Sequence, residues 1–271
     1  MDGCVDLERI VDTIRRHGEF DVICLQEVAR NFAELEGSRG EDDMAALAEM
    51  LPGYQGIYGA ATDLPTHHGR RKRFGNALFC RLPIGQVFRH RLPWPVDAGV
   101  PSMQRMLLEA VIEAPFGPVR VMTTHLEYYS RLQREAQIDA IRALHAEACA
   151  QARAPRPAED GASGPFAVYP RPCSAILCGD MNFPANAPER ARILAPIDPD
   201  TPVLCDAWEV IHPGVPHAPT AGIHKVDWLD TPSCFDFVFV SEDLAPRLNG
   251  MATDPDTAAS DHQPVWIELA D

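Results

Sequence analysis

The chain has 271 residues, of which 46% are hydrophobic and 23% are charged. These ordinary values indicate a globular protein with a substantial core and exclude a chain that is disordered throughout. The formal net charge of −15, from 24 basic and 39 acidic residues, argues against sequence-independent binding to nucleic acid or to an anionic membrane surface.

The apolar runs and the cysteines bear on where in the cell the protein is located. We expect no transmembrane segment, because the sequence has no run of about 18 apolar residues, and no signal peptide, because the first residues lack the apolar segment that one requires. The eight cysteines form no Cys-x-x-Cys pair and stand mostly within or beside apolar runs. This pattern is typical of buried thiols in a reducing compartment, so we expect a cytoplasmic protein without structural zinc.

The first predicted elements are a helix and a buried strand. Residues 6–18 place apolar residues at the spacing of one helical face, with basic residues near the end. Residues 20–25 are typical of a strand, which runs into Gln26 and Glu27. An acid at the end of a buried strand is either solvated or a ligand of a hard cation such as Mg²⁺.

One basic cluster stands out in this acidic chain. The segment 62–74 is predicted to be a loop, and its four consecutive cations include Arg70 and Arg71. Beside a site for a phosphate ester these cations would attract the substrate, whereas elsewhere they would form a solvated loop. The strand predicted at residues 74–80 carries Asn76, which points either to solvent or into a site.

The middle of the chain predicts two more strands and the longest helix. The strands cover residues 103–114 and 118–124, and the second runs directly into His125. A helix with capping-box spacing at Ser130 follows. Residues 152–172 are rich in Pro, Gly, Ala and Ser, so we expect a surface insertion there. The whole chain, 1–271, is otherwise predicted to be a single domain.

The segment 174–184 is the most informative stretch of the sequence. An apolar run typical of a buried strand is broken by Gly179 just before Asp180 and Asn182. If the extended geometry continues past the glycine, the two polar side chains share one face. Such a pair either orients a metal-bound water and an anionic oxygen, as hydrolysis of a phosphate ester requires, or forms an ordinary turn.

Polar residues also flank the last two predicted strands. The strand at residues 234–240 carries Asp236 near its start. Asp261 and His262 stand together directly before the final strand, at residues 264–269. A core seldom requires an Asp and a His side by side in that place. The many strands of mixed order, with about four helices, favour an α/β sandwich over a Rossmann sheet or a barrel.

Five polar motifs therefore punctuate apolar strands in the same way. They are Gln26-Glu27, Thr124-His125-Leu126, Gly179-Asp180-Met181-Asn182, Asp236 and Ser260-Asp261-His262. Their type and order resemble those of the endonuclease/exonuclease/phosphatase superfamily of DNase-I-like proteins, across nearly the whole chain. The resemblance implies a four-layer α/β sandwich of two mixed β-sheets flanked by helices, with the site at one end of the sheets.

The resemblance also implies roles for the acidic motifs. Glu27 looks like the main ligand of Mg²⁺, or alternatively Mn²⁺, and Asp261 like a second acidic group near the metal. Asp180 is similar to the residue that orients or deprotonates the attacking water. Asn182 is similar to its partner at the phosphate.

Further roles follow from the same resemblance. His262 would contact the scissile phosphate, with Asp236 fixing its tautomer and favouring its charged form. His125 resembles a second histidine near the phosphate or the leaving group. Asn76 and Thr220 fall where the family often has residues that line the site, and Arg70 and Arg71 are predicted to contact the substrate; these four complete the predicted set.

The sequence departs from the family pattern at its start. Family members usually begin with a strand that ends in an Asn at the metal site, whereas Met1 falls only a few residues before the first predicted helix. If this strand is truly missing, we expect the sheet to lose one strand and Glu27 to lose a partner; a misassigned or trimmed start would explain the gap equally well.

The leading hypothesis is a magnesium-dependent phosphoesterase that hydrolyses a phosphodiester or phosphomonoester by attack of water. The acidic charge favours a small-molecule or lipid-head-group substrate, with a nuclease on DNA or RNA as the alternative. A non-catalytic binding module that retains the fold is the rival from another class, although it would not need so complete a set of polar motifs. The oligomeric state is left open.

Overall fold

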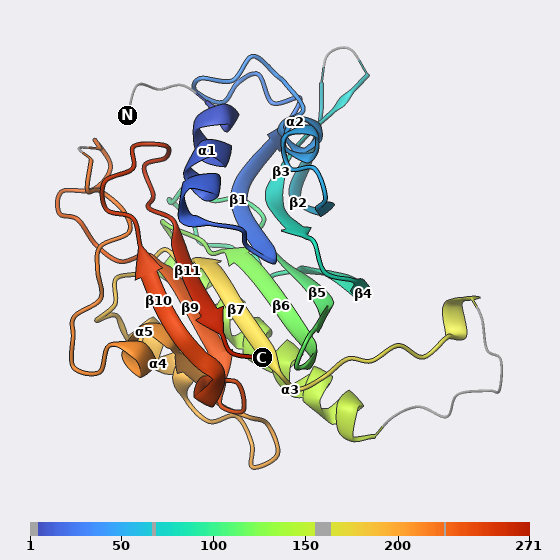
Figure 1. The fold of residues 1–271 in the computed structure, drawn as a ribbon. Helices are drawn as coiled ribbons and strands as arrows, with labels where there is room; N and C mark the ends of the chain where they lie inside the picture. The colour runs from blue at the N-terminus through green and yellow to red at the C-terminus, as the bar shows by residue number, and fades with distance from the viewer. Residues whose placement is uncertain (1–4, 67–68, 155–163, 225) are drawn as a thin grey trace.

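The structure is a computed structural model that describes residues 5–66, 69–154, 164–224 and 226–271. Two β-sheet layers pack face to face, and helices cover their outer faces (Figure 1). This arrangement confirms the four-layer α/β sandwich expected from the sequence.

The larger layer is a six-stranded sheet with the strand order β4-β5-β6-β7-β9-β8. Its strands are β4 (Ile84–Arg91), β5 (Met106–Ala114), β6 (Gly117–His125), β7 (Ala175–Asp180), β8 (Leu204–Asp206) and β9 (Asp236–Ser241). Strands β6 and β7 are parallel and the other neighbours are antiparallel. The last residues of β6 and β7 therefore meet the first residues of β9 at one end of the sheet.

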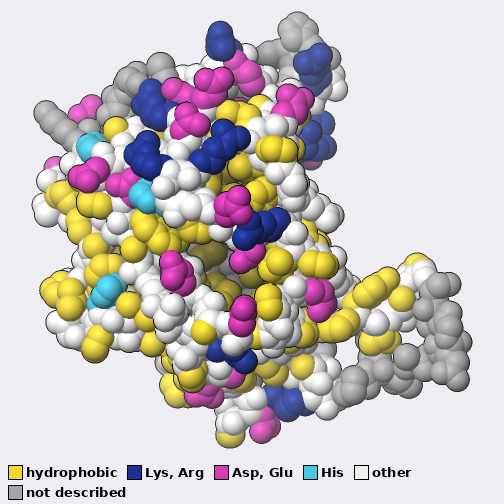
Figure 2. Space-filling view, viewed as in Figure 1, with side chains coloured by type: hydrophobic (Ala, Val, Ile, Leu, Met, Phe, Trp, Pro, Cys, Tyr) yellow, Lys and Arg dark blue, Asp and Glu magenta, His cyan; other side chains and the backbone are white. Residues whose placement is uncertain are grey.

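The second layer consists of two separate antiparallel sheets. One has the order β1-β3-β2 and the other is the pair β10-β11. Their bounds are β1 (Val22–Arg30), β2 (Gln55–Pro65), β3 (Arg71–Cys80), β10 (Leu248–Thr253) and β11 (Val265–Leu269). Within the described part of the chain, β1 and β11 each pair along one edge only. The space-filling view shows apolar side chains in a hollow between them (Figure 2).

The two cores explain why the layers stay together. Neighbouring residues of β5 point to opposite faces, so Leu107 packs under the helices and Leu108 packs between the sheets. The core between the sheets also includes Leu78 of β3 and Ile267 of β11, so both small sheets pack on the same face of the large one.

Five α-helices are found among the described residues. Their bounds are α1 (Leu7–His17), α2 (Asp43–Met50), α3 (Arg131–Arg153), α4 (Pro188–Leu194) and α5 (Ala207–Ile211), with 3₁₀ turns at Gly164–Phe166 and Ala245–Arg247. The expected cap of α3 is confirmed, because the Ser130 hydroxyl accepts from the Gln133 N–H at 3.1 Å. Helix α1 joins the two small sheets, since His17 stacks on Trp266 of β11 with ring centroids 4.6 Å apart. No helix in the described ranges is long and apolar enough to cross a membrane.

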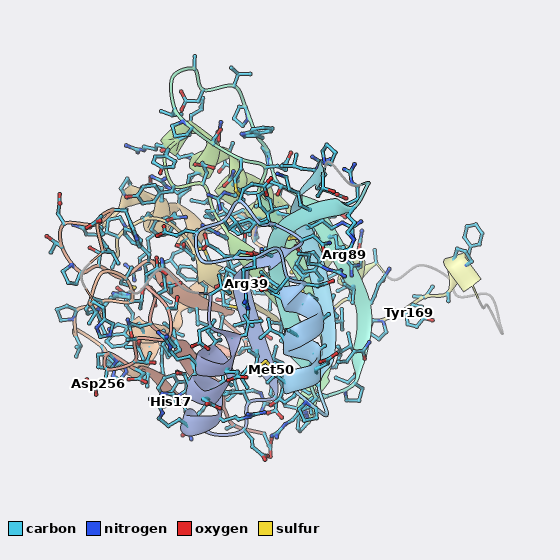
Figure 3. The ribbon with its side chains drawn as sticks, turned by 90° about the horizontal axis from the view of Figure 1, so that it is seen from above. His17, Arg39, Met50, Arg89, Tyr169 and Asp256 are labelled. Atoms are coloured by element: carbon cyan, nitrogen blue, oxygen red, sulfur yellow. The ribbon has the colours of Figure 1, made fainter. Side chains whose placement is uncertain are left out.

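The basic segment 62–74 and the insertion 152–172 were both predicted to be irregular. The basic segment expected as a loop is partly strand, because Arg73 pairs in register with Asp63 across the β2–β3 hairpin and its charge lies 3.2 Å from that carboxylate. Part of the expected insertion, residues 155–163, lies outside the described residues. The part that follows extends away from the body of the protein and exposes Tyr169 (Figure 3).

Candidate active site

The polar strand ends converge on Asp180, the last residue of β7. Its Cα partner is His125 in the parallel strand β6 and Asp236 in the antiparallel strand β9. The Nε2 atom of His125 lies 3.4 Å from Asp180 Oδ2, and the Nε2 atom of His262 lies 3.9 Å from the same oxygen. Sheet topology thus brings together residues that are far apart in the sequence.

The glycine before Asp180 is required by the close approach of β6. Gly179 has a φ of +134°, and a Cβ atom there would lie 2.0 Å from the carbonyl oxygen of Thr124. After Asp180 the chain turns, because Asn182 adopts a φ of 54°, which Asn tolerates better than most residues. The Asn182 N–H donates to Asp180 Oδ1 at 2.8 Å, and its side-chain amide donates to the Leu126 carbonyl at 2.8 Å. The turn therefore fixes the orientation of the Asp180 carboxyl.

His262 is held by a carboxylate that is itself held in place. Its Nδ1 atom lies 2.7 Å from Asp236 Oδ2, and the Thr220 hydroxyl donates to the same oxygen at 2.7 Å. Burial would lower the pKa of His262, but the charge of Asp236 and the bond to it, followed by the charges of Asp180 and Asp261, raise that pKa to about 10. The imidazole is therefore positively charged at neutral pH.

The pKa values of Asp180 and His125 are both shifted toward the uncharged form of the side chain. Asp180 is 7% exposed, and burial first and the charge of Asp236 second raise its pKa to about 8, against the influence of His262. Burial first, and then the charges of Arg105 and His262, lower the pKa of His125 well below its usual value. His125 is therefore neutral, and Asp180 is poised to gain or lose a proton near neutral pH.

Glu27 reaches the site from the second layer. Gln26 and Glu27 together lie opposite Asn76 of β3, which makes a β-bulge in β1. Glu27 has a φ of 60°, an unusual and strained conformation for a glutamate. Its Oε1 atom lies 3.7 Å from the Nδ1 atom of His125. The bulge thus aims a carboxylate at the end of β6.

The surroundings of Glu27 disfavour the negatively charged form of its side chain. Loss of hydration first, and the negative charge of Asp261 second, raise the pKa of Glu27, whereas His262 and Arg105 act against them. The side chain is 63% exposed, so solvent moderates the first effect. The neighbouring negative charges repel each other in the absence of a cation.

The donor atoms suit a hard divalent cation. Among the described residues, ligand atoms of Asp180, Asp236 and His262 lie within 4.8 Å of one another, and the two carboxylates of this group offer oxygen ligands, whereas the charged imidazole of His262 has no free lone pair. Glu27 and Asp261 bring two more carboxylates to the same region, since they interact electrostatically with each other and with His262. Carboxylate oxygens are the ligands that Mg²⁺ and Mn²⁺ prefer, and a cation here would relieve the repulsion that raises the pKa values of the acids.

The structure brings most of the predicted site residues together, but Arg70 and Arg71 lie apart from them. Arg71 donates to Asp63 with its Nε atom at 2.7 Å, on the β2–β3 hairpin, and Arg70 directly precedes it. Arg71 and Asn76 are five residues apart along β3, a separation of about 16 Å in an extended strand. The contact of Arg70 and Arg71 with the substrate stays a prediction.

Two residues beside the site were not anticipated. Trp228 stacks on the imidazole of His262, with ring centroids 5.7 Å apart and an angle of 16°. It lies in a loop without regular structure, where no sequence pattern indicates a contact. Arg105 lies directly before β5 and interacts with both His125 and Glu27. Its position before an apolar strand was a usable signal, because the other polar residues of the site also stand at strand ends.

Replacing Asp236 with Asn should lower the pKa of His262 from about 10 toward the usual range, because Asp236 is the strongest influence that raises it. The histidine would then lose its charge at lower pH. Imidazole ¹H–¹⁵N spectra recorded from pH 6 to 11 measure this directly. His212, which bonds to the Met251 carbonyl, serves as an internal reference for wider change. An unchanged titration of His262 would contradict the electrostatic account.

An α/β sandwich whose sheet ends gather carboxylates, an amide and two histidines around one point defines a hydrolase that acts on phosphoester bonds. The chain belongs to the Endonuclease/Exonuclease/phosphatase family, whose sequence model matches residues 2–262. The family assignment made from the five motifs is thus confirmed.

Solved structures give the same result for the fold. Mannosyl-6-phosphatase from Bacteroides thetaiotaomicron is 19% identical with a TM-score of 0.67, over 97% of this chain and 89% of that chain. An endonuclease/exonuclease/phosphatase from Beutenbergia cavernae is 24% identical with a TM-score of 0.62, over 99% and 67%. TDP2 from D. rerio, complexed with a single-strand DNA product, is 17% identical with a TM-score of 0.61, over 99% and 96%. No curated protein matches the sequence.

Proposed function

We propose that the protein is a magnesium-dependent phosphoesterase that hydrolyses a phosphodiester or phosphomonoester by in-line attack of water, with Mn²⁺ as an alternative ion. One observation carries this proposal: the buried carboxyl of Asp180 and the imidazole of His262, which is bonded to Asp236, lie 3.9 Å apart, and their raised pKa values fit complementary roles. The first suits a general base near neutral pH, and the second suits an anionic phosphoryl oxygen.

The proposed roles follow from position and charge. Asp180 takes the proton of the attacking water, and the Asn182 turn holds its carboxyl in place. His262 binds a phosphoryl oxygen, while Asp236 keeps it charged. Neutral His125 can donate a hydrogen bond, through its one N–H, near the leaving group.

Three further residues complete the proposed machinery. Glu27 and Asp261 would hold the metal ion, which would supply positive charge to the phosphoryl oxygens. Thr220 is 1% exposed and bonds to Asp236, so it acts by positioning that carboxylate.

Several observations favour a small substrate. The net charge of −15 opposes a polyanion, and the charge of Arg71 is already engaged by Asp63. One structural relative is named a mannosyl-6-phosphatase. We therefore propose a small-molecule or lipid-head-group phosphate ester and, from the distribution of the cysteines, a cytoplasmic location. A nuclease remains the second candidate, because TDP2 was captured with a DNA product.

Release of p-nitrophenol from p-nitrophenyl phosphate and from bis-p-nitrophenyl phosphate tests this proposal. Turnover should require Mg²⁺ or Mn²⁺ and should stop with EDTA, and the ratio of the two substrates separates a monoesterase from a diesterase. His262→Ala should lose activity, whereas His212→Ala, which removes a histidine bonded to a backbone carbonyl, should retain it. Absence of metal-dependent turnover here and with a panel of phosphate esters would favour the non-catalytic binding module.

A further inference from the structure

Two cysteines from different layers meet beneath the strand ends of the site. Cys24 of β1 and Cys178 of β7 hydrogen-bond to one another through their thiols. The hydroxyl of Thr123, the register partner of Cys178 in β6, hydrogen-bonds to both sulfurs. Gln26 donates its side-chain amide to the same hydroxyl oxygen at 2.9 Å, so the hydroxyl proton is free to face a sulfur. The two thiols and the hydroxyl thus form one cluster between the sheets.

Both cysteines of this cluster are accessible to solvent. Cys24 and Cys178 are partly exposed, whereas Cys80 on the neighbouring strand β3 is buried. Within the described ranges β1 pairs only with β3, so its other edge leaves the space between the layers open. Figure 2 shows the apolar hollow between β1 and β11 at this edge. A small uncharged oxidant can therefore reach the two sulfurs.

Each cysteine stands a short distance before a residue of the proposed active site. Cys24 precedes Glu27 by three residues along β1, and Cys178 precedes Asp180 by two along β7. Strands β1 and β7 belong to different layers. A bond between the two cysteines would therefore tie the strand that carries the proposed metal ligand to the strand that carries the proposed base.

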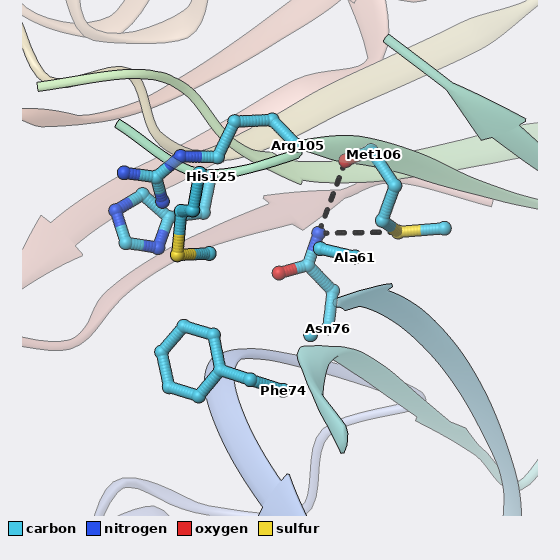
Figure 4. Close-up of a pocket in the computed structure, with 8 residues that line it drawn as sticks. Ala61, Phe74, Asn76, Arg105, Met106 and His125 are labelled. Carbon is cyan, nitrogen blue, oxygen red and sulfur yellow. Dashed lines mark hydrogen bonds between the residues drawn. The ribbon is translucent and has the colours of Figure 1, made fainter. Parts of the chain in front are cut away.

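A disulfide would shift the two layers relative to each other. Its sulfurs are about 2 Å apart, closer than hydrogen-bonded thiols, so the two strands must adjust. Strand β1 has room to move, since it has one unpaired edge among the described residues and contains the bulge at Gln26 and Glu27. The layers meet at the site across a pocket that Asn76 of β3 and His125 of β6 line together (Figure 4). A shift of about 1 Å there is enough to reduce turnover about a hundredfold.

We propose that Cys24 and Cys178 form an oxidative modification site, at which hydrogen peroxide converts the two thiols to a disulfide and lowers the activity of the protein. One thiolate attacks the peroxide O–O bond, which yields a sulfenic acid and, with the thiol proton, water. The second thiol then attacks the sulfenic sulfur, which forms the S–S bond and releases a second water. The thiols lose two protons and two electrons in total, and a dithiol reductant restores both. The effect on activity rests on the proposed function, whereas formation of the disulfide does not.

Mass spectrometry of the peroxide-treated protein tests for the disulfide. The full chain is treated with hydrogen peroxide, its remaining free thiols are blocked under denaturing conditions, and its digest is compared with and without dithiothreitol. A crosslink between Cys24 and Cys178 is expected, with a loss of two hydrogens that dithiothreitol reverses. Thiols that stay free, or that are oxidised without this crosslink, would overturn the inference.

Two variants assign the effect on activity to this pair. In the wild type, oxidation should lower turnover of a p-nitrophenyl ester by about tenfold or more, and dithiothreitol should restore it. The double variant Cys24→Ser/Cys178→Ser should keep its activity under the same treatment. Cys173→Ser is the control, because Cys173 is also partly exposed and hydrogen-bonds to the Cys149 thiol, and it should lose activity as the wild type does. Loss of activity in the double variant, or protection in Cys173→Ser, would contradict the inference.

Failure of folding and failure of the proposed function are distinguishable in this design. If the double variant does not fold, Cys24→Ala replaces it and should keep its activity, because Cys178 then has no thiol partner in the other layer. If the wild-type protein turns over none of the esters, the proposed function fails, while the mass measurement still decides whether the disulfide forms. A disulfide that leaves turnover unchanged would contradict the effect of the modification on the site.

Discussion

Asp180→Asn should lower kcat by about 10³-fold or more and, in EDTA, raise the melting temperature at pH 8. The activity falls because an amide cannot accept the proton of the attacking water, a step that contributes about 10²–10⁴-fold in enzymes. Stability rises because the buried carboxyl has a pKa of about 8, well above the value of an unfolded aspartate. Asn retains an oxygen that can accept the Asn182 N–H, so the turn is preserved.

The sign of the stability change follows from proton binding. A carboxyl whose pKa is raised by folding destabilises the folded state as pH rises through the interval between the two pKa values, here from about 4 to about 8. The gain in Asp180→Asn should be absent below pH 4 and should reach a few kcal/mol near pH 8, on the order of several degrees. Thermal unfolding followed by circular dichroism at several pH values measures it.

Asp206→Asn is the matched control for a buried aspartate. Burial would raise the pKa of Asp206, but His217 and Arg190, which lie 2.9 and 2.7 Å from its Oδ2 atom, lower it. This variant should therefore lose stability at neutral pH, because two partly buried partners lose their anion. Opposite signs for the two variants would support the account of the site. Full activity in Asp180→Asn would refute the assignment of the base.

Glu27→Gln should reduce activity by about a hundredfold or more at a Mg²⁺ concentration that saturates the wild type. The amide carries no negative charge and binds a hard cation weakly, so the activity should recover in part as Mg²⁺ is raised. Initial rates against metal concentration, together with calorimetric titration of the EDTA-treated protein with Mg²⁺, measure the change.

Glu19→Gln is the control, because it makes the same substitution just before the start of β1, at the end opposite Glu27. Glu19 is an exposed glutamate that pairs with Arg81 at 2.8 Å, an exposed contact of small energetic value. Its metal dependence should match that of the wild type. If Glu27→Gln and Glu19→Gln showed the same Mg²⁺ titration, Glu27 would not be a metal ligand.

The strand ends of the site were predictable because an apolar run and the polar residue that ends it coincide there. Buried strands are continuous apolar runs, and a polar residue that ends such a run must have its own reason to be there. His125 and Asp180 both stand at such ends, and the structure places them in register in neighbouring parallel strands. Sequence alone indicates each residue, and the sheet topology supplies their proximity.

Strands β4 and β10 are among those that could not be predicted, because pairing rather than local preference forms them. Strand β10 contains Asn249 and Gly250, which have low β propensity, and it exists through its ladder with β11. Strand β4 is half-exposed at the edge of the large sheet and includes the polar run Arg89 to Arg91. Such a run has no buried face that the sequence would reveal.

Contacts between distant loops were equally hidden from the sequence. The Thr220 hydroxyl bonds to Asp236, and Arg105 bonds to Glu127, across separations of 16 and 22 residues. Neither distance follows from spacing along the chain. The basic hairpin shows the converse, since the charges of Arg71 and Arg73 pair with Asp63 on the other strand of the same hairpin.

The division of the second layer affects how the protein moves. Glu27 belongs to β1, whereas Asp261 and His262 lead into β11, and within the described residues no strand pairing joins β1 to β11. Helix α1 links the two small sheets through the stacking of His17 on Trp266, and a ligand held by both sides would add a second link between them. Binding of such a ligand would then slow amide hydrogen exchange in β1 and β11 together, because the occupied site would stabilise the contact between the two small sheets.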